Sequence, residues 1–250
     1  MTSADLAGTT ALVTGATSGI GRATALMLAT RGAHVVISGR DATRGDEAVA
    51  AVRAAGGKAD FVAADLGDPD SVRALARQAV EIAGSHIDIL VNNAGVFPFG
   101  PTADATDADI DLVYAVNVRA PFILVGELAP AMAARGKGAI VNVLTMVAHF
   151  GVTGMALYGS SKAALTLLTK AWAAEFGPNG VRVNAVSPGP TRTLGTEPMG
   201  ETLDQFASLA PAGRPAAPEE IASAISYLAG DEASFVHGAV LDVDGGRNAA

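Results

Sequence analysis

The chain has 250 residues, half of them hydrophobic and only 17% charged, and its formal net charge is −8. A chain of this length and composition can bury one large core. The negative charge argues against binding to nucleic acid or to an anionic membrane surface, because both need clustered lysine and arginine. The sequence has no cysteine, which excludes disulfides and thiolate metal sites, and no His, Asp or Glu spacing suggests a metal site.

The beginning of the chain, Met1 to Leu6, has neither the basic region nor the long apolar run of a signal peptide. We also find no stretch with the roughly 20 apolar residues of a membrane span. The sequence therefore predicts a soluble, cytoplasmic protein with no membrane partner.

Short runs rich in valine and isoleucine recur along the chain, and most are continuously apolar, as in strands that are covered on both faces. They span residues 11–14, 34–38, 59–63, 87–91, 139–144, 181–187 and 239–243. Helical patterns lie between them, including 20–30, 71–83 and a helix that Pro218 opens and Gly230 can close. Together they predict an α/β fold: one Rossmann-type, doubly wound domain over residues 1–250, with a seven-stranded parallel sheet and helices on both faces.

One segment, residues 188–217, is rich in proline and glycine and lacks a clear helical or strand pattern. It is longer than an ordinary connection between two elements, and long connections are often functional. We therefore expect an active-site lid at about residues 190–217.

A glycine-rich turn follows the first predicted strand directly and precedes a predicted helix. Glycines let the backbone turn tightly and approach a pyrophosphate, and the helix N-terminus offers free N–H groups. A plain glycine turn is the alternative, but the position at the first strand–helix junction favours a dinucleotide site. The expected cofactor-binding residues of this turn are Gly15, Thr17, Ser18, Gly19, Ile20 and Gly21.

The second predicted strand ends at Gly39-Arg40, where dinucleotide folds meet the adenosine ribose. An acidic residue there would repel a 2′-phosphate, whereas Arg40 can bind one through two parallel hydrogen bonds. The alternative is a surface arginine paired with Asp41 or Glu47. We expect a preference for NADP(H), with NAD(H) possible.

Further motifs follow in a fixed order: Asn92–Gly95 after the fourth strand, Tyr158 with Lys162, Ser187–Gly189 after the sixth strand, and Val243–Gly246 near the end. Together with the glycine turn, they resemble the short-chain dehydrogenase/reductase family in order and spacing from residue 8 to residue 246. A Tyr-x-x-x-Lys pair alone is common, but this combination of motifs is specific. The resemblance implies an oxidoreductase that moves a hydride between a nicotinamide and a small alcohol/carbonyl pair, and a homotetramer.

Tyr158 and Lys162 fit this chemistry on physical grounds. Reduction of a carbonyl needs a proton donor at its oxygen, and a free tyrosine, with a pKa of about 10, is a poor base near neutral pH. Lys162 lies one helical turn further on the same face. Its charge should lower the pKa of Tyr158, which would act as acid in reduction and as base in oxidation.

The resemblance assigns roles to other residues. Thr145 stands where the family has a catalytic serine, thirteen residues before the tyrosine, and this is the clearest departure from the family pattern. Threonine keeps the hydroxyl, so we expect it to replace serine. Asn117 matches the family's asparagine that supports a water chain to the lysine. The remaining cofactor contacts expected are Asp65 and Leu66 at the adenine, Asn92, Ala94 and Gly95, Lys162 at the nicotinamide ribose, Tyr158, and the nicotinamide segment Pro188, Gly189, Thr191 and Thr193.

Two other functions remain open. Much of the sequence resembles 3-oxoacyl-[acyl-carrier-protein] reductases, which need basic residues to dock an acidic carrier. Ala174 stands where such members tend to have arginine, although Arg135 and Lys137 are nearby. A nucleotide-sensing protein without turnover is the second alternative, favoured only by Thr145. The apolar loop 96–101 suits an uncharged or partly hydrophobic carbonyl.

Overall fold

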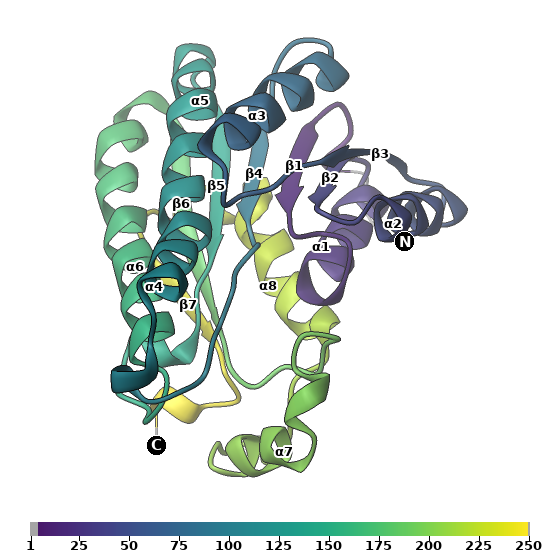
Figure 1. Ribbon diagram of the computed structural model, residues 1–250. Coiled ribbons are helices and arrows are strands. Elements are labelled where there is room, and N and C mark those ends of the chain that lie inside the picture. The colour runs from purple at the N-terminus through teal and green to yellow at the C-terminus, as the bar shows by residue number, and fades with distance from the viewer. Residues whose placement is uncertain (1–4, 250) are drawn as a thin grey trace.

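A computed structural model describes residues 5–249, which form a seven-stranded parallel sheet in the order β3-β2-β1-β4-β5-β6-β7 (Figure 1). Each strand lies within two residues of its predicted bounds, so the predicted fold class is confirmed. The strands are β1 Thr10–Thr14, β2 His34–Gly39, β3 Lys58–Ala63, β4 Ile89–Asn92, β5 Gly138–Val143, β6 Val181–Pro188 and β7 Val240–Val243.

Helices cover both faces of the sheet. Buried strand residues alternate between two cores: Ala11 and Val13 of β1 pack on the side of α1, α2 and α8, and Leu12 packs on the side of α3, α5 and α6. Because both faces are buried, the strands are continuously apolar in sequence. The helices are α1 Gly19–Thr30, α2 Ala42–Ala54, α3 Pro69–Ala83, α4 Asp107–Tyr114, α5 Ala120–Arg135, α6 Ala156–Phe176, α7 Glu201–Ser208 and α8 Pro218–Ala229.

The strand order places the functional region. The chain leaves β1 toward β2 and β3 on one side, and returns to β4 and the later strands on the other. This reversal opens a crevice at the carboxyl ends of β1 and β4, where open α/β sheets bind their ligands. The glycine turn after β1 and the Asn93–Gly95 segment after β4 both lie at this crevice.

A single long helix differs from the sequence expectation. A π-helical turn, Ala115–Arg119, joins α4 to α5, so that Asp107–Arg135 is continuous over 29 residues. By length and composition this helix could cross a membrane, so the expectation that the chain has no stretch of this kind was wrong. It is more than half buried and packs against α3, as core helices of the same composition do. The π turn inserts an extra residue that accommodates Asn117 and Pro121 without ending the helix.

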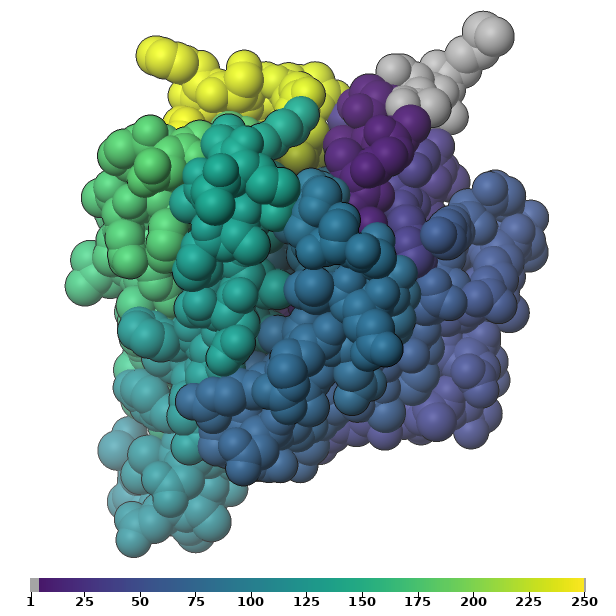
Figure 2. Space-filling view, turned by 90° about the horizontal axis from the view of Figure 1, so that it is seen from above, coloured from purple at the N-terminus to yellow at the C-terminus, as the bar shows by residue number. Residues whose placement is uncertain are grey.

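The segment predicted as a lid has more structure than expected. It contains a 3-10 turn, Glu197–Met199, and the helix α7, which lies beyond the sheet at one end of the molecule (Figure 1). An isolated β-bridge between Thr191 and Ala216 joins the two ends of this segment. At the opposite end, shown in Figure 2, the described start of the chain lies beside the residues that follow α8.

Candidate active site

The glycine turn has a conformation that other residues would strain. Gly15 and Gly19 have φ values of +63° and +51°, in the left-handed region. A Cβ at Gly21 would lie 2.4 Å from Nδ2 of Asn93, and one at Gly15 would lie 2.8 Å from Cα of Ala94. The turn therefore has no side chains at these glycines, and its backbone stays accessible at the start of α1. This glycine cradle fits a pyrophosphate.

Asn93, which the sequence analysis did not single out, joins this turn to β4. Its Nδ2 donates to the carbonyl oxygens of Thr14 at 2.8 Å and Gly15 at 3.1 Å. The hydroxyl of Thr14 accepts from the backbone N–H groups of Asn93 and Ala94, each at 3.1 Å. These bonds hold the two sides of the crevice in register.

Asn92, which was expected at the cofactor, does not line the crevice. It is 2% exposed, and its Nδ2 donates to Oδ1 of Asn142 on β5 at 2.9 Å. Successive residues of a strand point to opposite sides, so Asn93 occupies the place expected for Asn92. The signal was present in the sequence, since both belong to the same Asn-Asn-Ala-Gly motif.

The predicted adenosine residues line one trough of about 440 Å³, together with Ala94, Gly95 and Thr193. Arg40 is exposed at its rim, and within residues 5–249 it forms no ion pair. The alternative pairing with Asp41 is absent, because Asp41 binds Nε of Arg44 at 2.9 Å and caps α2. Asp65 and Leu66 are also on the trough wall.

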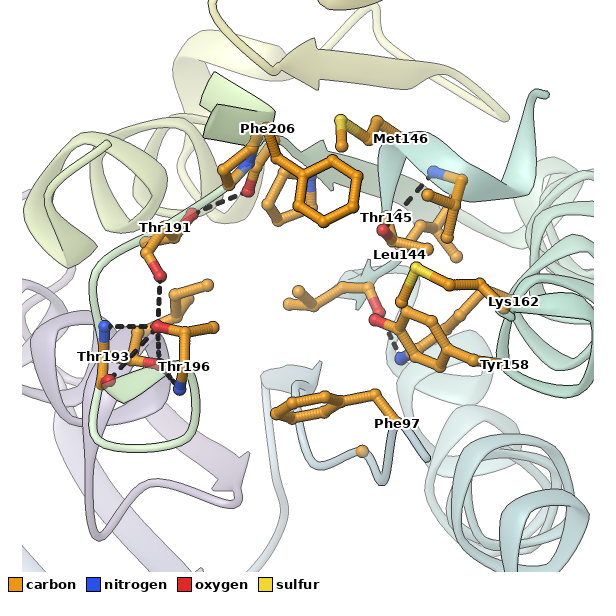
Figure 3. Close-up of a pocket in the computed structure, with 18 of the residues that line it drawn as sticks. Phe97, Leu144, Thr145, Met146, Tyr158, Lys162, Thr191, Thr193, Thr196 and Phe206 are labelled. Carbon is orange, nitrogen blue, oxygen red and sulfur yellow. Dashed lines mark hydrogen bonds between the residues drawn. The ribbon is translucent and has the colours of Figure 1, made fainter. Parts of the chain in front are cut away.

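The trough adjoins a second cavity of about 220 Å³, which holds the predicted reaction residues Thr145, Tyr158 and Lys162 (Figure 3). Tyr158 and Lys162 both lie in the first two turns of α6, and Thr145 follows β5. The cavity wall also includes Pro188, Gly189, Thr191 and Thr193, the predicted nicotinamide segment. The structure thus brings both halves of the predicted site together.

The pKa values of the pair differ from the sequence expectation. Burial raises the pKa of Tyr158 to about 12, and a hydrogen bond with the side chain of Thr145 offsets this only in part. Burial lowers the pKa of Lys162 to about 8. Lys162 was expected to lower the pKa of Tyr158, but its Nζ donates to the carbonyl of Val143 at 2.7 Å. Desolvation therefore dominates at both groups.

Asn117 lies behind the cavity, in the π turn, and does not line it. Its Oδ1 accepts from N–H of Val96 at 2.9 Å, and its Nδ2 donates to Oγ of Ser161 at 3.0 Å. Ser161 in turn donates to the carbonyl of Tyr158 at 2.7 Å. Asn117 thus connects the loop after β4 to the first turn of α6. Such π turns occur frequently at functional sites.

A network of threonine hydroxyls supports the segment after β6. Thr191 donates to the carbonyl of Gly189 at 2.9 Å, and Thr196 donates to the carbonyl of Thr191 at 2.7 Å. The side chain of Thr193 lies against the glycine turn, since a Cβ at Gly19 would be 3.1 Å from Cβ of Thr193. The base of the lid segment therefore borders the cradle.

Comparisons with known proteins agree with the family resemblance of the sequence motifs. A family model described as enoyl-(acyl carrier protein) reductase matches residues 15–248. A solved structure described as a short-chain dehydrogenase/reductase family protein is 52% identical, with a TM-score of 0.92 over 98% of this chain and all of that one. The chain belongs to the short-chain dehydrogenase/reductase family. It is therefore an enzyme, an oxidoreductase that acts on CH–OH groups with NAD(P) as acceptor.

Two further relatives carry substrate names. A cis-4-hydroxycyclohexanecarboxylate dehydrogenase of Sinomonas cyclohexanicum is 42% identical over 96% of each chain. The structure of a candidate NAD(P)-dependent gluconate 5-dehydrogenase from Beutenbergia cavernae, with NADP bound at low occupancy, is 39% identical, with a TM-score of 0.94 over 99% of each chain. These similarities cover nearly the whole of this short-chain dehydrogenase/reductase, but they name different substrates.

Proposed function

We propose that this enzyme is an NADP(H)-dependent oxidoreductase that interconverts a small alcohol with its ketone or aldehyde. The observation that carries the proposal is the presence of Tyr158, Thr145 and Lys162 on one cavity wall that adjoins the glycine cradle. A cytoplasmic location is part of the proposal, because a freely diffusing nicotinamide cofactor is supplied there.

In this proposal Tyr158 moves the proton. A bound nicotinamide supplies the hydride to the carbonyl carbon in reduction and accepts it in oxidation. Tyr158 donates its phenolic proton to the carbonyl oxygen, and a pKa near 12 keeps that proton in place at neutral pH. The hydroxyl of Thr145, on the same cavity wall as Tyr158, would donate to the developing negative charge on the substrate oxygen.

Lys162 and Asn117 support this proton transfer without donating or accepting the proton themselves. With a pKa of about 8, Lys162 is largely protonated at neutral pH, and its ammonium would hold the nicotinamide ribose. Asn117 fixes the first turn of α6 through Ser161 and supports a water chain to the lysine.

The preference for NADP(H) rests on Arg40. The arginine is exposed on the trough without an ion pair to Asp41 or Glu47, so its guanidinium is available to a 2′-phosphate. A Cβ at Gly39 would lie 2.6 Å from Cγ2 of Thr17, so a larger residue there would crowd the trough. NAD(H) remains the weaker cofactor in this proposal.

Reduction of a carrier-bound acyl group is favoured by the description of the family model, but not by the charges. Lys137 directly precedes β5, at the amino end of the sheet, whereas the cavity lies at the carboxyl end. There Lys137 pairs with Asp231 at 3.1 Å and Arg135 with Asp88 at 3.4 Å. These two basic residues are thus engaged by acids and lie away from the site.

The test uses the purified protein with a panel of ketones, followed through NADPH oxidation. Tyr158→Phe should abolish turnover and leave NADPH binding nearly unchanged, because only the transferable proton is lost. Tyr114→Phe is the matched control, since that hydroxyl bonds Ser160 outside the cavity. NADPH binding without turnover of any carbonyl by the native enzyme would favour the nucleotide-sensing alternative.

A second arm tests the cofactor. Arg40→Ala should raise the Michaelis constant for NADPH and barely change that for NADH, whereas Arg77→Ala, an exposed arginine on α3, should change neither. A native enzyme that uses NADH with equal or greater efficiency would overturn the NADP(H) preference.

A further inference from the structure

Apolar side chains make up much of the cavity wall around Tyr158. They come from segments far apart in sequence: the loop after β4, the turn after β5, the residues before α6, and the segment that contains α7 (Figure 3). The larger members of this apolar wall are Phe97, Leu144, Met146, Met155, Met199 and Phe206, and the uncharged polar side chains of the cavity are Asn93, Thr145, Tyr158, Thr191, Thr193 and Thr196. The ring of Phe97 lies against that of Tyr158, with 6.0 Å between their centroids.

Lys162 is the only charged side chain on this cavity within residues 5–249. Its Nζ is bound to the carbonyl of Val143, and a Cβ at Gly95 would lie 3.3 Å from it. Lys162 is also only 2% exposed. The ammonium is therefore held against Val143 and Gly95, and the apolar wall itself carries no cation.

The lid helix holds Phe206 in this position. Leu203 and Ala207 of α7 are buried and anchor the helix. Asp204 of the same helix pairs with Arg192 at 2.7 Å, near the base of the lid. Phe206 points from α7 into the cavity, on the side of Met146 and opposite Phe97 (Figure 3).

These walls determine which substrates can bind. A carboxylate moved from water into apolar surroundings without a counter-charge loses its hydration, at a cost of several kcal/mol. A cavity of about 220 Å³ is also smaller than the roughly 300–1,000 Å³ typical of sites for drug-sized ligands. Both the charge and the size of the cavity therefore limit the substrate.

Building on the proposed function, we propose that the substrate is a compact, uncharged, mostly hydrocarbon ketone or its secondary alcohol, such as a simple alicyclic one. We further propose that Phe206 is a specificity-determining residue that excludes carboxylates. This separates the chain from its relative from Sinomonas cyclohexanicum, which is named for a substrate that carries a carboxylate.

The test compares substrates that share one ring. Cyclohexanone, methyl 4-oxocyclohexanecarboxylate and the free 4-oxocyclohexanecarboxylate are reduced with saturating NADPH, and kcat/KM is measured for each. We expect kcat/KM for the ester to exceed that for the acid by about 100-fold or more, because each tenfold corresponds to only about 1.4 kcal/mol. Cyclohexanone should resemble the ester.

Substitutions of Phe206 and Met199 test which wall residues exclude the carboxylate. Phe206→Arg places a cation on the apolar wall and should shift the acid-to-ester ratio of kcat/KM at least tenfold toward the acid. Phe206→Leu, which keeps the site apolar, should leave the ratio unchanged. Met199→Lys is a second cationic variant from the 3-10 turn, in case the first fails to fold.

The outcomes separate the two proposals. A native enzyme that reduces the acid as efficiently as the ester would overturn this inference and leave the proposed function intact. A ratio that Phe206→Arg leaves unchanged would remove Phe206 as a determinant. Failure to reduce any ketone with either cofactor would contradict the proposed function, and this inference with it.

Discussion

The hydroxyl of Thr145 is the first residue-scale feature to test. It lies on the same cavity wall as Tyr158, so its loss removes a donor to the substrate oxygen. Thr145→Ala should lower kcat by about 10²–10³-fold, as loss of one oxyanion donor does elsewhere. Thr145→Ser keeps the donor and should stay within about tenfold of the native enzyme.

Thr145→Val is the matched control, because it keeps the branched shape and deletes only the hydroxyl. Equal kcat values for the Val and Ser variants would show that this hydroxyl is dispensable. The neighbouring serines are poor substitutes, since Ser160 donates to the carbonyl of Leu157 and Ser161 to that of Tyr158, and neither lines the cavity.

The buried charge of Lys162 should lower the free energy of unfolding of the native protein. Burial lowers its pKa from 10.5 to about 8, and each pKa unit corresponds to about 1.4 kcal/mol. Lys162→Met, which keeps the volume and removes the charge, should therefore abolish turnover and raise the free energy of unfolding at pH 7 by roughly 1–3 kcal/mol.

The pH dependence of this gain follows from the sign of the pKa shift. Below pH 8 the lysine is protonated in both the folded and the unfolded state, so the penalty is fully present. Between pH 8 and 10.5 the folded protein loses its proton first, so the native protein approaches the variant in stability. Denaturant unfolding from pH 7 to 10.5 measures this, and a stability difference that is independent of pH would contradict it.

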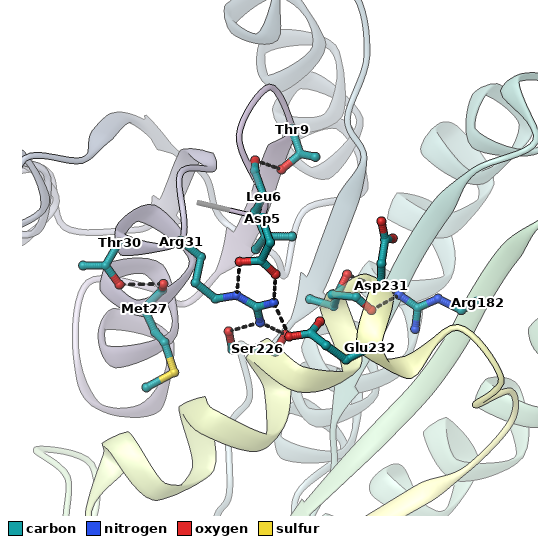
Figure 4. Close-up of polar contacts among 12 residues, drawn as sticks. Asp5, Leu6, Thr9, Met27, Thr30, Arg31, Arg182, Ser226, Asp231 and Glu232 are labelled. Carbon is teal, nitrogen blue, oxygen red and sulfur yellow. Dashed lines mark hydrogen bonds and ion pairs between the residues drawn. The ribbon is translucent and has the colours of Figure 1, made fainter. Parts of the chain in front are cut away.

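At the scale of elements, Arg31 joins three parts of the chain at the end opposite the site (Figure 4). It directly follows α1 and binds the carboxylate of Asp5. It also donates to the carbonyl of Ser226 on α8 at 2.6 Å and pairs with Glu232 at 2.7 Å. The guanidinium thus connects the start of the chain, α1 and α8.

We expect Arg31→Met to lower the free energy of unfolding by about 2 kcal/mol, because charge-assisted hydrogen bonds contribute roughly 1.5–3 kcal/mol and the carbonyl of Ser226 would keep only the N–H of Gly230 as a donor. The site lies at the other end of the sheet, so kcat should change little. Arg73→Met, at exposed ion pairs with Asp70 and Glu127, is the control and should cost less than about 1 kcal/mol. Equal losses for both arginines would contradict the role of Arg31.

At the scale of the whole molecule, two apolar surfaces point to assembly. Phe122 of α5 and Leu167 of α6 are 55% and 69% exposed. Elsewhere Phe235 is fully exposed, and Leu241 on the edge strand β7 is 37% exposed. Two separate self-complementary surfaces produce a tetramer in closed symmetric oligomers. We therefore propose a homotetramer.

Light scattering at micromolar concentration should give the mass of four chains for the native protein. Combining Phe122→Glu with Leu167→Glu should reduce this to two chains, because charges would be buried at one surface only. Glu substitutions at exposed Arg77 and Lys58 serve as the control and should leave the mass unchanged. A native monomer would contradict the proposal.

The sequence by itself determined the sheet and half of the site. Continuous apolar runs showed that the strands are covered on both faces, and the position of Gly15 and Gly19 at the first strand–helix junction marked the cradle. Tyr158 and Lys162 were recognisable because the pair follows the glycine turn and precedes Ser187–Gly189 in the order and spacing of the family. The order and spacing of motifs along the chain are therefore sufficient to predict these features.

Only the tertiary structure decided the rest. The sequence analysis did not predict one continuous helix over Asp107–Arg135, which passes Asn117 and Pro121 through a π turn and packs against α3. The sequence also offered no reason to place Phe206 opposite Phe97, because residues distant in sequence meet only in the folded chain. It also favoured a lowered pKa for Tyr158, whereas burial raises it to about 12. Desolvation depends on every atom packed around the phenol, and that environment exists only in the folded chain.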